Sequence, residues 1–139
     1  MVVRVRLKVN VGSKSVEKVA LLNSGYEAPS PQLLIPIDTA KQLGLWPPEE
    51  ALEAEFDTAG GVLKAWIYLK VGKVKILTAE GGSKTVENVD MVVSPLAEEL
   101  LISDALAEEL EIAVESFGRG LWRFRWEPIN KVKKSEKKE

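Results

Sequence analysis

The sequence has 139 residues, of which 45% are hydrophobic and 29% charged, and its formal net charge is −2. This length and composition predict one soluble globular domain with a substantial core. The small net charge gives no overall field that would attract nucleic acid or a membrane surface. The sequence has no Cys and no His, which excludes disulfides, thiol nucleophiles, thiolate metal sites and Ser-His triads.

An enzyme with this composition would be left with carboxylate, Lys, Tyr or hydroxyl chemistry, or with an all-oxygen metal site. No apolar run approaches the length of a membrane span, and residues 1–4 do not begin a signal peptide. We therefore expect a cytoplasmic protein that does not contact a membrane. The missing Cys and the many Glu and Lys residues also suit a thermophilic source.

The first 22 residues predict two antiparallel strands. Apolar and polar residues alternate without error from Val3 to Val11, which is typical of a strand with one wet face. Residues 12–14 predict a turn. A second strand follows from Val16 to Leu22 and becomes continuously apolar from Val19 onward. Both faces of that strand are therefore expected to be covered near its end.

The apolar run ends in Asn23-Ser24-Gly25. A buried strand that opens into a tight polar turn predicts a polar tip at a cleft, and the simpler alternative is an ordinary loop turn. At these residues the sequence resembles the retropepsin-like aspartic peptidases, in particular their archaeal and cellular members. The signature of that family is two or more apolar residues followed by Asp-Thr-Gly or Asp-Ser-Gly. Here Asn23 stands in the position of the catalytic Asp.

The segment after the turn predicts a short strand and a short helix. Leu33 to Ile35 indicate a buried strand, and residues 36–44 indicate a helix. Asp38 is expected to cap the start of this helix, and Gly44 to end it in the left-handed conformation. A similar segment, with a helix ending in Leu-Gly-Leu, follows the active-site turn in cellular retropepsin-like domains.

A glycine pair between apolar stretches predicts a hairpin from Phe56 to Trp66. Residues 49–55 just before it are helical by propensity but strand or loop by resemblance. The hairpin resembles the flap that closes over substrate in retropepsins. The resemblance therefore implies that substrate contacts come from the hairpin tip and from the two residues after the turn: Ala59, Gly60, Gly61, Tyr26 and Glu27.

Asp57 offers a rival assignment, because Asp57-Thr58-Ala59-Gly60 also looks like a catalytic motif. The run before it is not the continuously apolar strand that would hold a buried aspartate, whereas residues 19–22 are. We therefore place the catalytic position at Asn23 and treat Asp57 as a flap or turn residue. Further along, residues 66–77 predict one or two strands around Gly72, and residues 89–93 predict another.

Residues 100–112 form the second informative stretch. Periodicity alone would allow one helix over residues 95–110. The family resemblance implies instead a buried strand at Leu100 to Ile102, a cap at Ser103, and a helix whose Leu106 and Leu110 face the core. This element crosses beneath the active-site loop in the family.

Two residues of this stretch depart from the family pattern. Ser103 stands where the family usually has Gly. Asp104 stands where viral members often have a basic residue. The ion pair that such a basic residue would make with an acidic residue after the turn, here Glu27, is expected to be lost or replaced.

The C-terminal part combines an aromatic strand with a charged tail. Trp122, Phe124 and Trp126 share one face of a strand, which predicts either core packing or a subunit interface. Together with the neighbouring arginines and the lysines of the tail, they also suggest an alternative, a nucleic-acid-binding platform. We expect one domain over residues 1–127 and a disordered charged tail over residues 128–139.

The resemblance implies a mainly β fold, a closed retropepsin-like barrel with one or two short helices, and a homodimer whose interface forms a peptide-binding cleft. Catalysis in that family needs two carboxyl groups that share one proton. Asn23 neither titrates nor acts as a general base. We therefore expect a protein that binds a peptide or unfolded segment without cleaving it, with no cofactor, no metal and no nucleic-acid partner. Alternatively, it is an active endopeptidase silenced by an Asp-to-Asn change.

Overall fold

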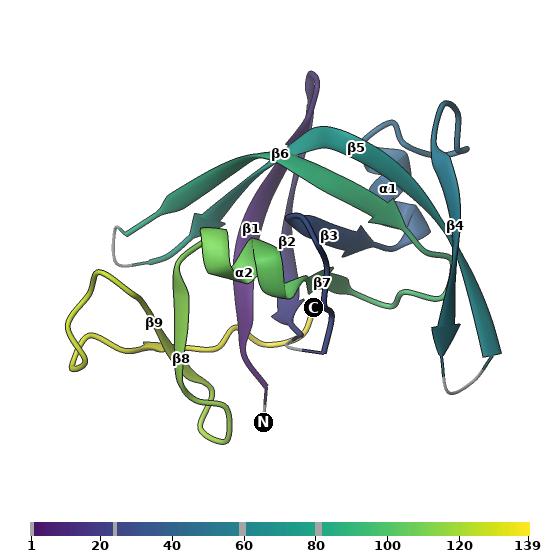
Figure 1. The fold of residues 1–139 in the computed structure, drawn as a ribbon. Coiled ribbons are helices and arrows are strands. Elements are labelled where there is room, and N and C mark those ends of the chain that lie inside the picture. The colour runs from purple at the N-terminus through teal and green to yellow at the C-terminus, as the bar shows by residue number, and fades with distance from the viewer. Residues whose placement is uncertain (1, 24, 59–60, 80–81) are drawn as a thin grey trace.

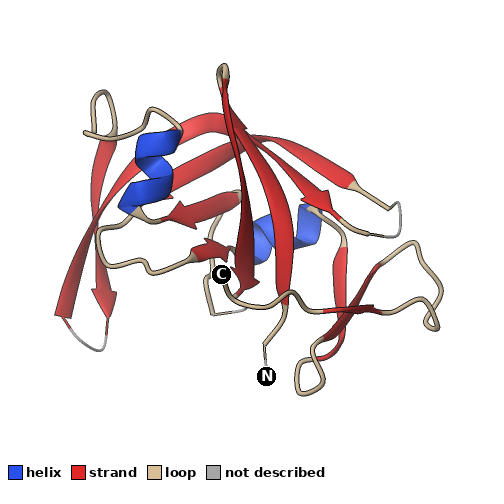
Figure 2. Ribbon diagram, turned by 180° about the vertical axis from the view of Figure 1, so that it is seen from behind, coloured by secondary structure: helices blue, strands red, loops and turns tan. Residues whose placement is uncertain are grey.

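The computed structural model describes residues 2–23, 25–58, 61–79 and 82–139. Half of the chain lies in β-strands and 9% in helices, and six of the strands close into a barrel with two short helices (Figures 1 and 2). The prediction of a mainly β closed barrel with one or two short helices is therefore confirmed.

The first two strands form the hairpin that the alternation predicts. Strand β1 spans Arg4–Val11 and β2 spans Lys14–Leu22, and the two pair antiparallel over their whole length. The apolar residues of β1 point inward, where Leu7 and Val9 are fully buried. Gly12 forms the turn with a positive φ of 58°, a conformation that costs glycine little.

The next elements also appear, with one difference at the helix start. Strand β3 spans Gln32–Ile35 and helix α1 spans Ile37–Gln42. The expectation that Asp38 caps α1 is wrong, because Pro36 occupies the N-cap position and Asp38 lies within the first turn. An acidic side chain there still interacts favourably with the helix dipole. Gly44 ends the segment with a φ of 74°, as expected.

Three long strands form the middle of the chain. Strand β4 spans Leu52–Thr58, β5 spans Gly61–Leu77 and β6 spans Lys84–Val93. Strand β5 is a single strand with a register irregularity near Gly72. A β-carbon at Gly72 would lie 2.0 Å from Cε of Met91, so only glycine fits there without a shift of that side chain.

The last part of the chain supplies the second helix and a small second sheet. Strand β7 spans Leu100–Ile102, and helix α2 spans Asp104–Glu109. Strands β8 (Ile112–Ser116), β9 (Leu121–Phe124) and β10 (Lys133–Lys134) form a separate three-stranded sheet in the order β10-β9-β8. A strand, a cap and a short helix therefore replace the single helix that periodicity alone would allow over residues 95–110.

The barrel closes because β1 pairs with two neighbours. The main sheet has the order β1-β2-β7-β3-β6-β5-β4, and an additional β1–β5 pairing joins its ends. Strand β4 lies outside this circle and pairs with β5. The β2–β7 and β3–β6 pairs are parallel, whereas the other pairs of the sheet are antiparallel. In Figure 1 the β4–β5 hairpin extends away from the barrel on the side where β2 ends.

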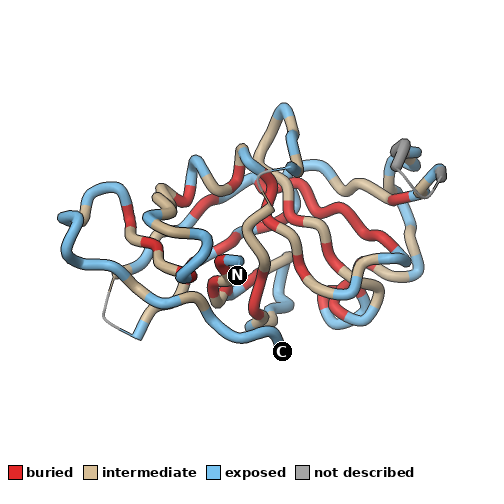
Figure 3. The backbone as a smooth tube through the Cα atoms, turned by 90° about the horizontal axis from the view of Figure 1, so that it is seen from below, coloured by how far each residue is buried: buried red, intermediate tan, exposed pale blue. Residues whose placement is uncertain are grey.

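The core fills the interior of the barrel and includes buried residues of α2 and β9. Figure 3 shows the buried parts of the chain in red. The buried side chains of the core come from all six barrel strands, from α2 and from β9, which ties the barrel, α2 and the small sheet into one packed unit. The largest of them are Leu7, Leu33, Ile35, Leu43, Ile76, Met91, Ile102, Leu106, Leu110 and Phe124.

Residues 128–139, which we expected to be a disordered tail, run along the barrel and contact β9 and β1 in the structure. Strand β10 pairs with β9. The amide of Arg4 donates to Oγ of Ser135 (2.7 Å), and the amide of Glu136 donates to the carbonyl of Arg4 (2.8 Å). The tail thus bonds to the edge of β1 at Arg4, beyond the point where the pairing of β1 with β5 ends. Its partners on β1 are more than 100 residues away in sequence, so local composition does not reveal them.

Candidate functional site

Asn23 lies directly after β2, where the chain leaves the barrel. Its amide donates to the carbonyl of Ile102 at 3.3 Å, and its own carbonyl accepts from the amide of Tyr26 at 3.0 Å. The residues before it are covered as the apolar run predicts, with Ala20 fully buried and Leu22 half-buried. The start of the turn is therefore held between β2 and β7.

The side chain of Asn23 is committed to this turn. Its Oδ1 accepts from the amide of Gly25 at 3.1 Å, an Asx-type bond across two residues. An aspartate could accept the same bond, because the two side chains differ only in the NH2 group. That group can only donate, so the site offers a neutral donor where a carboxylate would offer an acceptor. Ser24 lies outside the described residues.

Strand β7 and α2 pass beside the turn, as the family resemblance implies. Oγ of Ser103 accepts from the amide of Leu106 at 3.1 Å, which confirms the predicted cap, and also from the amide of Gln32 at 3.0 Å. Ser103 is fully buried. One hydroxyl therefore joins β3, β7 and the start of α2. The predicted burial of Leu106 and Leu110 is also observed.

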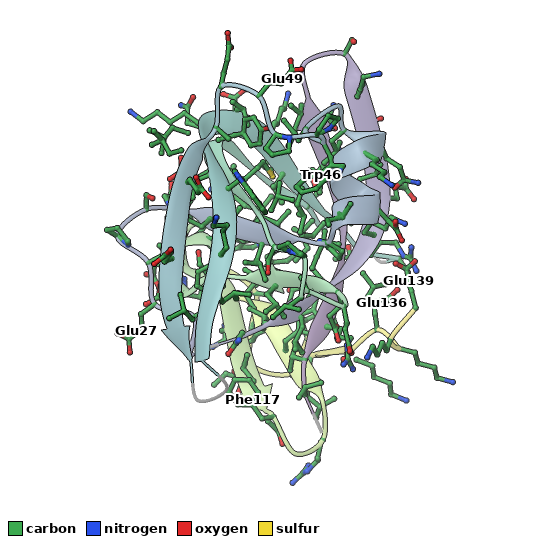
Figure 4. All side chains as sticks on the ribbon, turned by 90° about the vertical axis from the view of Figure 1, so that its right-hand side faces the viewer. Glu27, Trp46, Glu49, Phe117, Glu136 and Glu139 are labelled. Atoms are coloured by element: carbon green, nitrogen blue, oxygen red, sulfur yellow. The ribbon has the colours of Figure 1, made fainter. Side chains whose placement is uncertain are left out.

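Asp104 ties α2 to the loop after Asn23. Its amide donates to the carbonyl of Tyr26 at 2.8 Å, and its Oδ1 accepts from the amide of Ala28 at 2.9 Å. These backbone contacts stand in place of the ion pair with Glu27 that the viral pattern would provide. The side chain of Glu27 is exposed and points away from the barrel (Figure 4).

Tyr26 faces the interior of the loop through its hydroxyl, which donates to Oε1 of Gln32 at 2.9 Å. Burial raises the pKa of Tyr26, and the nearby charge of Asp90 raises it further. The phenol therefore stays protonated at ordinary pH. Its hydroxyl fixes the loop and does not point freely toward a substrate.

Asp90 is a structural residue of this region that the sequence reasoning missed. It is only 4% exposed, and its carboxylate accepts from the hydroxyl of Ser30 at 2.7 Å and from the amide of Lys70 at 2.8 Å. Lys70 has a positive φ of 56° at the irregularity of β5. One carboxylate thus fixes both the loop after Asn23 and the bend of β5. A lone acid in the apolar run of residues 89–93 was the available signal.

A small cavity of about 190 Å³ opens beside Asn23. Its walls are mostly apolar and come from β2, β7, α2, β8 and the loop after β8. This volume is below that of typical small-ligand pockets and suits a single inserted side chain. The residues around it are Leu22, Asn23, Ile102, Asp104, Ala107, Glu108, Ile112, Val114 and Phe117. Phe117 is 48% exposed and lies at the end of the molecule that carries the turn (Figure 4).

The segment expected to form a flap is the β4–β5 hairpin. Gly61 begins β5 and pairs with Thr58, whereas Ala59 and Gly60 lie outside the described residues. Asp57 pairs with Val62 along the hairpin, and its side chain also lies outside what the structure describes. The hairpin and the end of β2 lie on the same side of the barrel (Figure 1).

The aromatic strand belongs largely to the core. Trp122 is 3% exposed and Phe124 is fully buried, and their rings meet edge to face at 5.1 Å. Trp126 is half-exposed and stacks on Phe124 at 4.3 Å. Two of the three aromatic side chains are therefore not accessible to a nucleic-acid base.

A scan against models of known protein families finds no match for this sequence, and a search of curated proteins also finds none. Across the described ranges, no three His, Cys, Asp or Glu side chains gather where they could hold a metal ion. Among the residues that the structure describes, no helix is long and apolar enough to cross a membrane.

Proposed function

We propose that this chain is a retropepsin-like protein that binds an extended peptide or unfolded segment at a homodimer interface and does not cleave it. The observation that carries the proposal is Asn23. It follows a buried strand of a closed barrel, beside a strand–helix element, and an amide replaces the acid at that position.

Three features of the fold support this assignment. The turn at Asn23 is held by Ile102 and by its own bond to Gly25, as a rigid active-site turn would need. A long hairpin with a free outer strand lies on the same side of the barrel. An exposed strand edge can pair with an extended peptide through main-chain hydrogen bonds. The cavity at Asn23 would then take one side chain of that peptide.

The chemistry of the amide explains the proposed lack of cleavage. Peptide hydrolysis by this class needs one carboxylate to accept a proton from water and a second, protonated carboxyl group to donate to the substrate carbonyl. Asn23 can donate through its NH2 group but cannot accept a proton at ordinary pH. The two copies in a dimer would therefore orient a carbonyl group without activating water.

Two alternatives have less support. Asp57 would serve as the acid only if it faced the turn, and it lies in the hairpin strand β4 instead of following a buried strand. A nucleic-acid platform would need exposed aromatic rings, whereas Trp122 and Phe124 are buried. The basic residues of the tail still support it, but two of them pair with acids, Lys133 with Glu127 and Lys138 with Glu99.

Sedimentation and binding measurements test the proposal. We expect a concentration-dependent dimer and saturable binding of an unfolded, fluorescently labelled casein fragment that stays intact. Ala107→Trp fills the cavity beside Asn23 and should weaken this binding at least tenfold. Ala113→Trp on the neighbouring strand β8, outside that cavity, is the matched control. A strict monomer that does not bind the fragment would contradict the proposal.

A further inference from the structure

A second cavity lies between the barrel and the three-stranded sheet. Its volume is about 590 Å³, roughly three times that of the cavity at Asn23, and the two share no residue. Its walls come from β1, the end of β5, β9 and the C-terminal tail. This volume lies within the range of small-ligand pockets, about 300–1,000 Å³. The tail therefore borders an open cavity large enough for a small organic molecule.

The inner wall of this cavity is apolar. Val5 and Trp122 lie behind this wall, almost completely buried within the core, so its accessible apolar surface comes from neighbouring residues. Leu77 and Val132 continue this surface toward the opening, where Val132 is 37% exposed. Apolar ligand surface placed here would leave water, which is the main favourable contribution to the binding of such a group.

The rim of the cavity is cationic. Arg6, Lys133 and Lys134 surround the opening, and Glu136 is the single acid among the residues around it. The ammonium group of Lys133 is held by Glu127 and lies 5.4 Å from the centre of the Trp122 ring. A fixed positive group at the end of an apolar wall is complementary to an anionic head on an apolar body.

The other two cations differ in their partners. Lys134 is exposed and has no ion-pair partner among the described residues. Nε of Arg6 lies 3.2 Å from Glu136, and Nη1 lies 3.5 Å from Glu139. Both acids belong to the end of the tail and lie at the edge of the barrel (Figure 4). A ligand carboxylate would therefore compete with Glu136 for Arg6.

We propose that this cavity binds a small amphipathic carboxylate, with its apolar body against Leu77 and Val132 and its head between Lys134 and Arg6. The site is separate from Asn23, so it does not depend on the proposed peptide binding. The competition with Glu136 gives the proposal a specific signature. Removal of that acid should strengthen binding, whereas removal of the lysine should weaken it.

Calorimetric titration of the full chain with decanoate at pH 7 tests this site. We expect one molecule bound per chain and much weaker binding of decanol, which lacks the charge. Lys134→Gln should weaken decanoate binding about fivefold. Glu136→Gln should strengthen it about threefold, and the main-chain bond of Glu136 to Arg4 is kept in that variant. Lys131→Gln, an equal change of charge outside the cavity, should leave the affinity unchanged.

A second variant tests the contribution of the cavity to binding without changing a charge. Val132→Trp fills the opening and should abolish decanoate binding, while the urea midpoint of unfolding stays within the range of the other variants. The proposal is overturned if decanoate does not bind at millimolar concentration. It is also overturned if decanol binds equally well, or if Lys134→Gln and Glu136→Gln affect the affinity no more than Lys131→Gln does.

Discussion

The hydroxyl of Ser103 holds together the region beside Asn23, and its removal gives a sharp test of the fold. This hydroxyl is fully buried and accepts from two main-chain amides, those of Gln32 and Leu106. Ser103→Ala leaves both amides without a partner. A buried donor without a partner costs about 1–3 kcal/mol, and loss of a helix N-cap costs about 1 kcal/mol. The amide of Leu106 is the one that Ser103 caps, so the two costs overlap there. We therefore expect a total loss of about 2–4 kcal/mol of unfolding free energy.

Urea unfolding followed by tryptophan fluorescence measures this loss. With a slope of about 2 kcal/mol per molar urea, the midpoint should fall by about 1–2 M. Ser13→Ala, at an exposed position in the β1–β2 turn, is the control and should shift it by less than about 0.3 M. An equally small shift for Ser103→Ala, with an unchanged slope, would refute the proposed role of the hydroxyl.

Three further predictions concern the core and the charges. Gly72→Ala should cost about 1–3 kcal/mol by the same urea assay, because the added methyl group overlaps a core side chain. Phe124→Ala should cost about 3–5 kcal/mol, whereas Phe117→Ala, at a half-exposed position, should cost less than about 1 kcal/mol; equal losses would mean that β9 is not part of the core. The hydrogen bond from Arg4 lowers the pKa of Glu99, so the stability from this pair is present above the ordinary glutamate pKa and is lost as the pH falls through the lowered value. Urea midpoints measured from pH 7 down to pH 3 should therefore fall less in Glu99→Gln than in the unchanged chain, and parallel curves would contradict this.

The sequence predicted best those elements whose signals are local. Alternation in residues 3–11 is a direct consequence of the two-residue period of a strand, and β1 follows it. The cap at Ser103 and the inward direction of Leu106, which the family resemblance implied, are also observed. The turn at Asn23 was recognisable because the apolar run before it ends abruptly.

Elements that depend on distant partners were predicted less well. Residues 49–55 have helical propensity, but pairing with β5 makes Leu52–Thr58 a strand, since tertiary contacts override propensity. Asp90 was missed because its partners Ser30 and Lys70 lie 60 and 20 residues away. The charged tail is typical of disorder by composition alone, and composition gives no sign of its contacts with β1.

Cleavage of an unfolded protein across pH 3 to 7 tests most directly the claim that this is a retropepsin-like site without its acid. The unchanged chain and Asn23→Asp should be compared at equal concentration and equal dimer content. This range covers the pH at which two carboxyl groups share one proton. We predict that only Asn23→Asp cleaves the substrate. If neither protein cleaves it although both fold and dimerise, the assignment of the site is contradicted. If both cleave it, another carboxylate is the catalyst, and Asp57→Asn is the next variant to measure.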